Sequence, residues 1–517
     1  MKTDIEIAQQ AKLKLIVDVA KQAGLNLADV ELHGCYKAKI NLQAFKHLAK
    51  AKEGKLVLVT AMTPTPQGEG KTTTTIGLAQ ALPNSVVCIR EPSLGPVMGM
   101  KGGAAGGGYS QVLPMEDINL HLTSDMHMVT SAHNLLTAML YNHIHQGNEL
   151  GIDENRIVWR RVMDMNDRAL RGTFDITASS EVMAILCLAK DLEDMKARLG
   201  RIIVAYNRQG KPVTAADLKA QGAMALLMFD ALKPNLVQTI EGGPAFIHGG
   251  PFANIAHGCN TLIATRLALK LADYVITEAG FATDLGAEKF FDIKCRAAGL
   301  QPSAAVLVVT KQAIERHGYA NVAKHVGNLQ LFGVPVVIAV NRKANDTDQE
   351  IAAILAECAG LGVPAEESDV WAKGGKGGKA LAKAVAQAAA GPSSFKPLYD
   401  LGLPLKDKIE LIATRIYGAD GVDYTAKAQA DLALLAENGL SNVPVCIAKT
   451  QYSLSDNPKV YGRPQGFRIT IRELKPSAGA GFVVALAGDI MTMPGLPKHP
   501  AAENMDVTAD GKITGLF

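Results

Sequence analysis

The chain has 517 residues, of which 48% are hydrophobic and 20% charged, enough for two or three domains with substantial cores. Its 53 basic and 50 acidic residues give a net charge of +3 without a long basic block, which argues against nucleic acid or an anionic membrane as partner. Seven cysteines, never spaced as C-x-x-C, indicate reduced thiols. The first residues form no apolar signal segment and the apolar runs are strand-sized, so we expect a cytoplasmic protein.

Short β-branched runs alternate with helical stretches along the chain. Strands are predicted at residues 56–60, 86–89, 202–205, 275–277, 306–310 and 334–340. This alternation predicts an α/β fold with a mostly parallel sheet and helices on both faces. Ligands bind such sheets beyond the carboxyl ends of the strands. Three of these ends carry polar residues, in the 63–75 loop, at Arg90 and in residues 341–343, and we expect them to line one cleft.

The first of these strands leads into a glycine-rich turn, residues 63–75, that is followed by helical apolar spacing over 76–82. This order is typical of a loop that cradles nucleotide phosphates, as in P-loop NTPases. Lys71 is expected to reach the β- and γ-phosphates, and Thr72 to ligate Mg²⁺. The loop is a variant, because Thr65 stands where the common pattern has its first glycine. The predicted nucleotide-binding residues are Thr65, Pro66, Gln67, Gly68, Glu69, Gly70, Lys71 and Thr72.

A second glycine-rich segment, residues 101–109, follows Arg90. Such a glycine content is not expected inside a helix or a strand. It predicts a backbone wall that closely approaches a small ligand or a phosphate, although a flexible surface loop is the alternative. Arg90 alone is weak evidence, but together with Lys101 it favours anion binding.

The next stretch contains His121, His127 and His133 among acidic residues. Their spacing matches no familiar metal motif, so a hydrogen-bonding role is favoured over ligation of a transition metal. Asp125 is the best candidate here for a polar contact near the cleft. The glycine- and histidine-rich residues 248–258 are interpreted as a tight, buried inter-domain loop rather than as a catalytic segment.

With these motifs the chain resembles the formate–tetrahydrofolate ligases, also called formyltetrahydrofolate synthetases, over nearly its whole length. The resemblance rests on residues 63–75, 90–109, 114–121, 159–168, 249–258, 284–290, 371–375 and 489–497. It implies ATP-dependent formylation of tetrahydrofolate through formyl phosphate, with ADP and phosphate as products. It also implies Lys71 and Arg90 as catalytic residues, a homotetramer, and use of a monovalent cation, potassium or ammonium, besides Mg²⁺.

The chemistry of that reaction fits the residues present. Formate is a weak anionic nucleophile and has to approach a negatively charged phosphoryl group. Lys71 and Mg²⁺ would draw charge from the phosphoryl group, while Arg90 would hold formate in line.

The chain also departs from the pattern of the family. Lys343 stands where a phenylalanine is usual, and that ring, with the tryptophan matching Trp371, resembles a clamp for the flat pterin. A lysine cannot replace the apolar half of such a clamp. In addition, a longer segment is usual after Gly318, and a glycine is usual at Ala282.

We therefore expect a ligase with three domains: residues 1–328, which bind nucleotide and formate; residues 329–392, a second α/β domain contributing to the folate cleft; and residues 393–517, a C-terminal α/β domain. The last boundary follows a small-residue helix, 380–390, and a Gly/Pro/Ser linker. Three alternatives remain: a ligase with an altered folate acceptor, a nucleotide-binding paralogue without ligase activity, and a general phosphate-loop ATPase.

Overall fold

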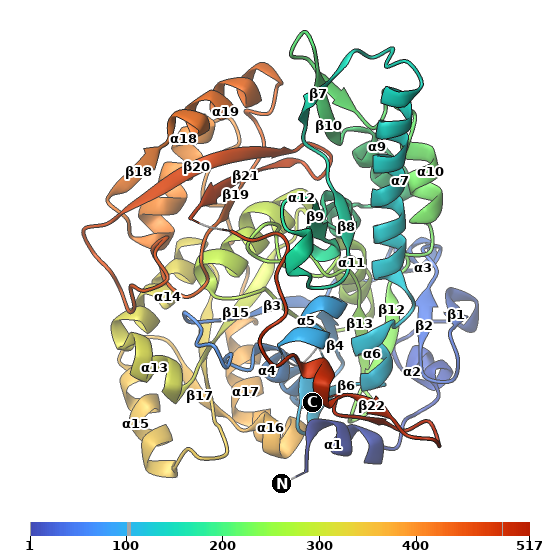
Figure 1. Ribbon diagram of the computed structural model, residues 1–517. Coiled ribbons are helices and arrows are strands. Elements are labelled where there is room, and N and C mark those ends of the chain that lie inside the picture. Colours follow the sequence, from blue (N-terminus) through green and yellow to red (C-terminus); the bar gives the residue numbers. More distant parts are fainter. Residues whose placement is uncertain (1, 101–104, 489, 517) are drawn as a thin grey trace.

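The computed structural model describes residues 2–100, 105–488 and 490–516. Within these residues a 12-stranded sheet runs in the order β1-β2-β12-β13-β4-β14-β3-β15-β16-β17, with β6 beside β12 and β5 beside β6 (Figure 1). In sheet order, strands β13, β4, β14, β3, β15, β16 and β17 run parallel to one another. Strands β1, β2, β12 and β13 are paired antiparallel at the other edge. The predicted α/β fold with a mostly parallel sheet is confirmed.

The strands of this sheet have the following bounds: β1 (Val30–Leu32), β2 (Ala38–Ile40), β12 (Asn235–Thr239), β13 (Pro244–Ile247), β4 (Ser85–Ile89), β14 (Tyr274–Glu278), β3 (Lys55–Ala61), β15 (Pro302–Val309), β16 (Val336–Asn341), β17 (Ala365–Ser368), β5 (Gly106–Gly107) and β6 (Ser110–Leu113). All the predicted strands up to residue 340 except one lie in it. The exception, 202–205, forms β10 (Ile203–Asn207), which pairs antiparallel with β7 (Ile152–Ile157) and β11 (Pro212–Thr214) in a separate sheet.

Both faces of the central sheet are covered, as alternate residues of β3 show. Leu56 and Leu58 belong to one apolar cluster, and Val57 and Val59 belong to another. Helices α11 (Leu262–Leu271) and α14 (Tyr319–Leu331) contribute to the first cluster, whereas α4 (Lys71–Ala81) and α17 (Lys379–Ala388) contribute to the second. A strand that is buried on both faces is continuously apolar, which is why β3 could be recognised in the sequence.

The C-terminal part forms its own four-stranded sheet, in the order β18-β20-β21-β19 (orange and red in Figure 1). The bounds are β18 (Gly421–Tyr424), β20 (Arg468–Ser477), β21 (Phe482–Ala487) and β19 (Val445–Ala448), with helices α18 (Leu405–Leu411) and α19 (Ala426–Glu437). Helix α18 continues as a π-helix from Ile412 to Tyr417.

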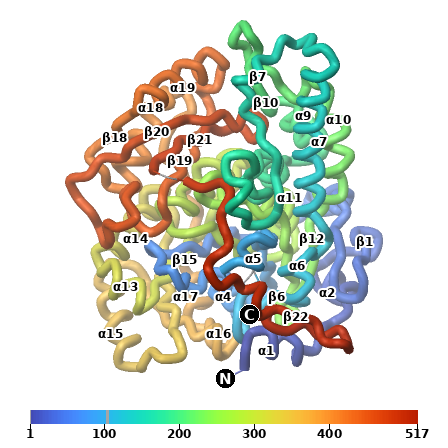
Figure 2. The backbone as a smooth tube through the Cα atoms, in the orientation of Figure 1, coloured from blue at the N-terminus to red at the C-terminus, as the bar shows by residue number. Residues whose placement is uncertain are grey.

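Beyond β21 the chain returns across the molecule to helix α1 (Asp4–Gln10), as the red end of the tube in Figure 2 shows. There the hairpin of β22 (Asp506–Val507) and β23 (Ile513–Thr514) meets α1, because Gln9 Nε2 donates to the carbonyl of Ile513 at 2.9 Å. Among the described helices, none has the length and apolar character needed to cross a membrane.

The expected domain division remains a prediction. Its first boundary, between 328 and 329, falls between β15 and β16, which are neighbours in the central sheet. Its second boundary, between 392 and 393, falls between that sheet and the four-stranded one.

Candidate active site

The turn between β3 and α4 is shaped by glycines. Gly68 and Gly70 have φ of 77° and 73°, in the left-handed region that favours glycine. A Cβ atom on Gly70 would also lie 2.5 Å from Nδ2 of Asn341. Helix α4 begins at Lys71 with Gly70 as its N-cap, so the N–H groups of the first helical turn are directed toward the loop. This is the geometry that binds anions at helix N-termini.

The conformation of the loop is stabilised by hydrogen bonds to the carboxylate of Glu69, a residue of the loop itself. Glu69 is buried, and its Oε1 accepts the N–H of Thr65 at 2.6 Å, while its Oε2 accepts the hydroxyl of Thr310, which follows β15. Asn341 Nδ2 donates to the carbonyl of Glu69 at 2.9 Å, and Gln312 Nε2 donates to Thr65 Oγ1 at 2.8 Å. The Glu69 side chain thus stabilises the conformation of the loop.

The three strand ends expected to converge are connected by contacts. Thr72 Oγ1 donates to Oε2 of Glu278 at 2.8 Å, and Oε1 of Glu278 lies 3.9 Å from Nη2 of Arg90. Glu278 is the last residue of β14, which lies between β3 and β4 in the sheet. On the other side, Lys343 Nζ lies 3.5 Å from the carbonyl of Gly68. The loop, Arg90 and the end of β16 therefore form one site.

Arg90 is held at one edge of its guanidinium group. Nη1 donates to the carbonyl of Pro251 at 3.2 Å, and a Cβ atom on Gly280 would lie 3.2 Å from Nη1. The Arg90 side chain is 24% exposed, so a small ligand can reach it. The next residue, Glu91, is buried, and burial raises its pKa well above its usual range, which favours its neutral form. A guanidinium group so placed suits a small carboxylate.

The remaining predicted nucleotide-binding residues lie around the loop. Pro66 and Gln67 are exposed at its tip, and Lys71 is half-buried at the start of α4. Lys71 is thereby next to Thr72 and close to the helix N-terminus.

Trp371 lies on α16 (Val370–Lys373) and packs against the β5–β6 hairpin. Its carbonyl accepts the N–H of Tyr109 at 2.8 Å, and a Cβ atom on Gly107 would lie 3.2 Å from its Nε1. Within the described residues no hydrogen bond or ring contact joins Trp371 to Lys343, so the pterin clamp stays a prediction.

The glycine-rich segment 101–109 differs in part from expectation. Lys101 and the next three residues lie outside the described part of the chain. Gly106 and Gly107 form the short strand β5, which pairs with β6 in a tight hairpin. Gly106 has φ of 83° and Gly108 has φ of 55°, so glycine permits the turn although the segment contains a strand.

The histidines have structural contacts. His121 Nδ1 and His127 Nε2 lie 2.9 Å apart on the surface, and the described residues contain no group of three or more side chains that could hold a metal ion. Asp125 is buried in an ion pair with Lys39 at 2.7 Å and accepts from Asn235 Nδ2 at 2.7 Å. Its polar contacts are therefore with a buried network.

His133 gives a testable pH dependence. Its Nε2–H donates to the carbonyl of Arg160 and its Nδ1 accepts from Ser180, both at 2.7 Å, and burial lowers its pKa from 6.5 to about 4. Between these values only the unfolded chain binds the proton, so this residue's stabilising contribution is lost as the pH falls. For His133→Gln we expect a lower stability than wild type at pH 7, and a deficit about 2 kcal/mol smaller at pH 5. Urea denaturation at both pH values measures this, and equal deficits would contradict it.

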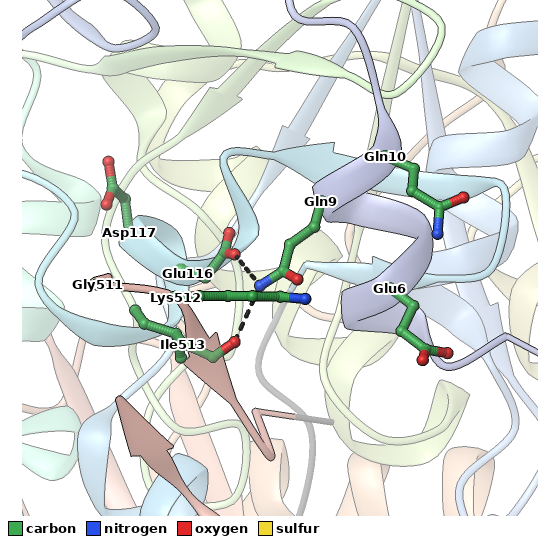
Figure 3. A pocket seen from close by; sticks show the side chains of 8 residues that line it. All are labelled: Glu6, Gln9, Gln10, Glu116, Asp117, Gly511, Lys512 and Ile513. Carbon is green, nitrogen blue, oxygen red and sulfur yellow. Dashed lines mark hydrogen bonds between the residues drawn. The ribbon is translucent and has the colours of Figure 1, made fainter. Parts of the chain in front are cut away.

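An open cavity of about 640 Å³ lies elsewhere, between α1, α6 (Met115–Leu120) and the β22–β23 hairpin (Figure 3). Gln9 crosses it and donates to Glu116 at 3.1 Å. The cavity is lined by Glu6, Gln9, Gln10, Glu116, Asp117, Gly511, Lys512 and Ile513. None of these residues was predicted to belong to the nucleotide or formate site.

The fold and the grouping of Lys71, Thr72, Glu278 and Arg90 define an α/β enzyme with its site at the carboxyl edge of a parallel sheet. The family model for formate–tetrahydrofolate ligase matches residues 2–517, essentially the whole chain. The chain belongs to the formate–tetrahydrofolate ligase family, whose enzymes join formate to tetrahydrofolate in an ATP-dependent reaction. The resemblance noted in the sequence is thereby confirmed.

Sequence reasoning missed several residues of this site. Glu278, Thr310 and Gln312 carry no motif, Pro251 was noted only as part of residues 249–258, and each is brought to the loop or to Arg90 by chain folding. The available signal was position: Glu278 directly follows the predicted strand 275–277, and Thr310 ends the predicted strand 306–310, where ligands of such sheets bind.

Proposed function

We propose that the ligation proceeds in two steps at the loop and Arg90, through formyl phosphate. The observation that carries this proposal is the chain of contacts from Thr72 through Glu278 to Arg90, because it puts the start of α4 beside a guanidinium group that can bind a carboxylate. A nucleotide phosphate and formate would then be neighbours.

In the first step, a formate oxygen attacks the γ-phosphorus of ATP and the bond to the β,γ-bridging oxygen breaks, so that ADP leaves. Lys71 and the N–H groups of the first turn of α4 would stabilise the charge on the phosphoryl oxygens, while Arg90 orients formate. In the second step, an amine of tetrahydrofolate attacks the formyl carbon and phosphate departs. The fastened loop and the buried surroundings would keep water from hydrolysing the intermediate.

Thr72 and Glu278 would hold Mg²⁺. Their oxygen atoms are hard donors only 2.8 Å apart, and Glu278 is a buried carboxylate that lies 3.9 Å from Nη2 of Arg90. Such oxygen ligands suit Mg²⁺. When bound, the ion would neutralise charge on the β- and γ-phosphates.

Glu278→Gln tests this assignment through binding. We expect the variant to bind ATP in EDTA as wild type does, but to lose most of the increase in affinity that Mg²⁺ gives, by about tenfold. Isothermal titration of ATP with and without Mg²⁺ measures it. The control is Glu181→Gln, which changes a carboxylate that accepts the N–H groups of Gly479 and Ala480. A full Mg²⁺ effect in Glu278→Gln would exclude Glu278 as a ligand.

Product formation tests the proposed function itself. Purified protein incubated with ATP, Mg²⁺, formate and tetrahydrofolate should release ADP and formyltetrahydrofolate in equal amounts, and omission of formate should stop both. Isotope transfer from ¹⁸O-formate to phosphate would support formyl phosphate. A nucleotide-binding paralogue without ligase activity would release no ADP in response to formate, and a general ATPase would release ADP without it.

The second candidate is a ligase with an altered folate acceptor, favoured by Lys343 at the position of the usual phenylalanine. Lys343 lies beside the loop, half-buried. For Lys343→Phe we expect a lower KM for tetrahydrofolate, by a few-fold, because a ring can stack on the pterin. Steady-state kinetics with tetrahydrofolate and with polyglutamylated folates would measure the change, and an unchanged or higher KM would remove this explanation.

From the family resemblance we also infer a cytoplasmic homotetramer that uses potassium or ammonium. Sedimentation velocity would measure the assembly, and assays in potassium, ammonium and tetramethylammonium salts would measure the cation effect.

A further inference from the structure

Lys289 is a buried cation near the proposed formate site. It lies between the π-helical segments Thr283–Ala287 and Phe290–Cys295 and is fully buried. Its Nζ donates to the carbonyls of Ala253 at 2.6 Å and of Asn254 at 3.4 Å. A lysine is rarely buried without a carboxylate, so carbonyl partners call for an explanation.

The carbonyls that Lys289 binds belong to the loop that holds Arg90. Pro251, two residues before Ala253, accepts from Arg90 Nη1 at 3.2 Å. Ala253 itself packs against Gly280, where an added Cβ atom would overlap the Ala253 side chain at 2.4 Å and lie 3.2 Å from Nη1 of Arg90. Lys289 thus fixes a segment that touches Arg90 both directly and through Gly280.

The acidic side chains next to Lys289 have other partners or are neutral, so the Lys289 ammonium group donates to these carbonyls. The carboxylate of Asp292 already accepts from Leu398 N at 2.8 Å and from Arg296 at 3.1 Å. Glu288 is fully buried, and it shares a side-chain hydrogen bond with the carboxyl group of Asp292. Because burial raises its pKa well above the usual range, Glu288 is favoured in its neutral form.

We propose that Lys289 is a positioning residue for formate binding: by fixing the 251–254 loop, it sets the orientation of the Arg90 guanidinium. The proposal rests on the proposed function, in which Arg90 binds formate. A bidentate guanidinium–carboxylate pair depends on orientation, so release of the loop should weaken formate binding while the nucleotide loop, held by other residues, is unaffected.

The test is Lys289→Met, which keeps the length of the side chain and removes its charge and its donors. A hydrogen bond to a charged group is strong enough to change a binding constant by about tenfold or more. We expect the KM for formate to rise about tenfold, with the KM for ATP within twofold of wild type. The control is Lys408→Met, since Lys408 is also fully buried and also donates to two carbonyls, of Ser441 at 2.7 Å and Val443 at 3.0 Å, in the C-terminal part.

Other outcomes separate the two proposals. Equal rises in both KM values, or an unchanged KM for formate, would overturn the positioning role of Lys289. In Arg90→Ala/Lys289→Met, the KM for formate should not exceed that of Arg90→Ala alone, because both changes act through one group. If Arg90→Ala itself leaves this KM unchanged, the proposed formate site fails instead. If Lys289→Met does not fold, Lys289→Gln is tested instead, with Lys408→Gln as its control. The KM values for formate and for ATP are then compared in the same way.

Discussion

Lys71→Ala is expected to lower kcat for formate-dependent ADP formation by about 10³-fold or more. Lys71 opens α4 directly after the glycine loop, where its ammonium group would meet the phosphoryl group as charge moves onto the leaving oxygen. ATP binding should weaken far less, because the helix N-terminus and the loop backbone still hold the phosphates. Single-turnover formation of formyl phosphate and equilibrium binding of ATP separate the two effects.

The chain provides a matched control in Lys379→Ala. Lys379 is likewise the first residue of a helix, α17, but is exposed and lies outside the site. We expect wild-type kinetics from this variant. Near-normal turnover in Lys71→Ala would refute the catalytic role of Lys71, and a loss of ATP affinity with kcat unchanged would make it a binding residue only.

Arg90→Ala is expected to raise the KM for formate about 100-fold and to lower kcat. The guanidinium group donates from Nη1 to the carbonyl of Pro251, and its Nη2 lies 3.9 Å from Glu278. Because the side chain is 24% exposed, added guanidinium ion should restore part of the activity of Arg90→Ala. The measurement is initial velocity against formate, with and without guanidinium.

For comparison, Arg266→Ala removes an exposed arginine from α11 and should change neither constant. If Arg90→Ala has a normal KM for formate, formate must bind elsewhere. The contacts from Thr72 through Glu278 to Arg90 would then not connect the nucleotide and formate sites. A rise in the KM for formate that guanidinium ion does not reverse would still support Arg90 as the formate-binding residue. It would indicate that the space left by the removed side chain is not accessible to guanidinium.

The sequence predicted the elements whose side chains follow simple rules. The β3 run is continuously apolar since the strand is buried on both faces, and Gly68, Gly70 and Lys71 follow a motif that is local in the chain. Arg90 could be found because it directly follows a strand. Glu278 could not, since its contact with Thr72 joins residues 206 positions apart and depends on the order of strands in the sheet.

Two other features, the segment from Thr283 to Cys295 and the position of strand β10, could not be predicted from sequence patterns. The segment from Thr283 to Cys295 is wound partly as π-helix, so its apolar residues do not repeat with the α-helical period. It also buries Glu288, Lys289, Asp292 and Lys294, which composition alone would assign to a solvated surface. Strand β10 was predicted from its apolar run, but such a run does not specify which sheet a strand joins.

The position of β14 between β3 and β4 has a consequence for substrate size. Neighbouring strands are about 4.8 Å apart, so the ends of β3 and β4, which lead to the glycine loop and to Arg90, are separated by two such intervals, and this gap is fixed by main-chain hydrogen bonds. Side-chain substitutions cannot widen it. An engineered enzyme for bulkier acids would therefore have to be redesigned in the segments that connect these strands to the helices, such as the loop before Lys71.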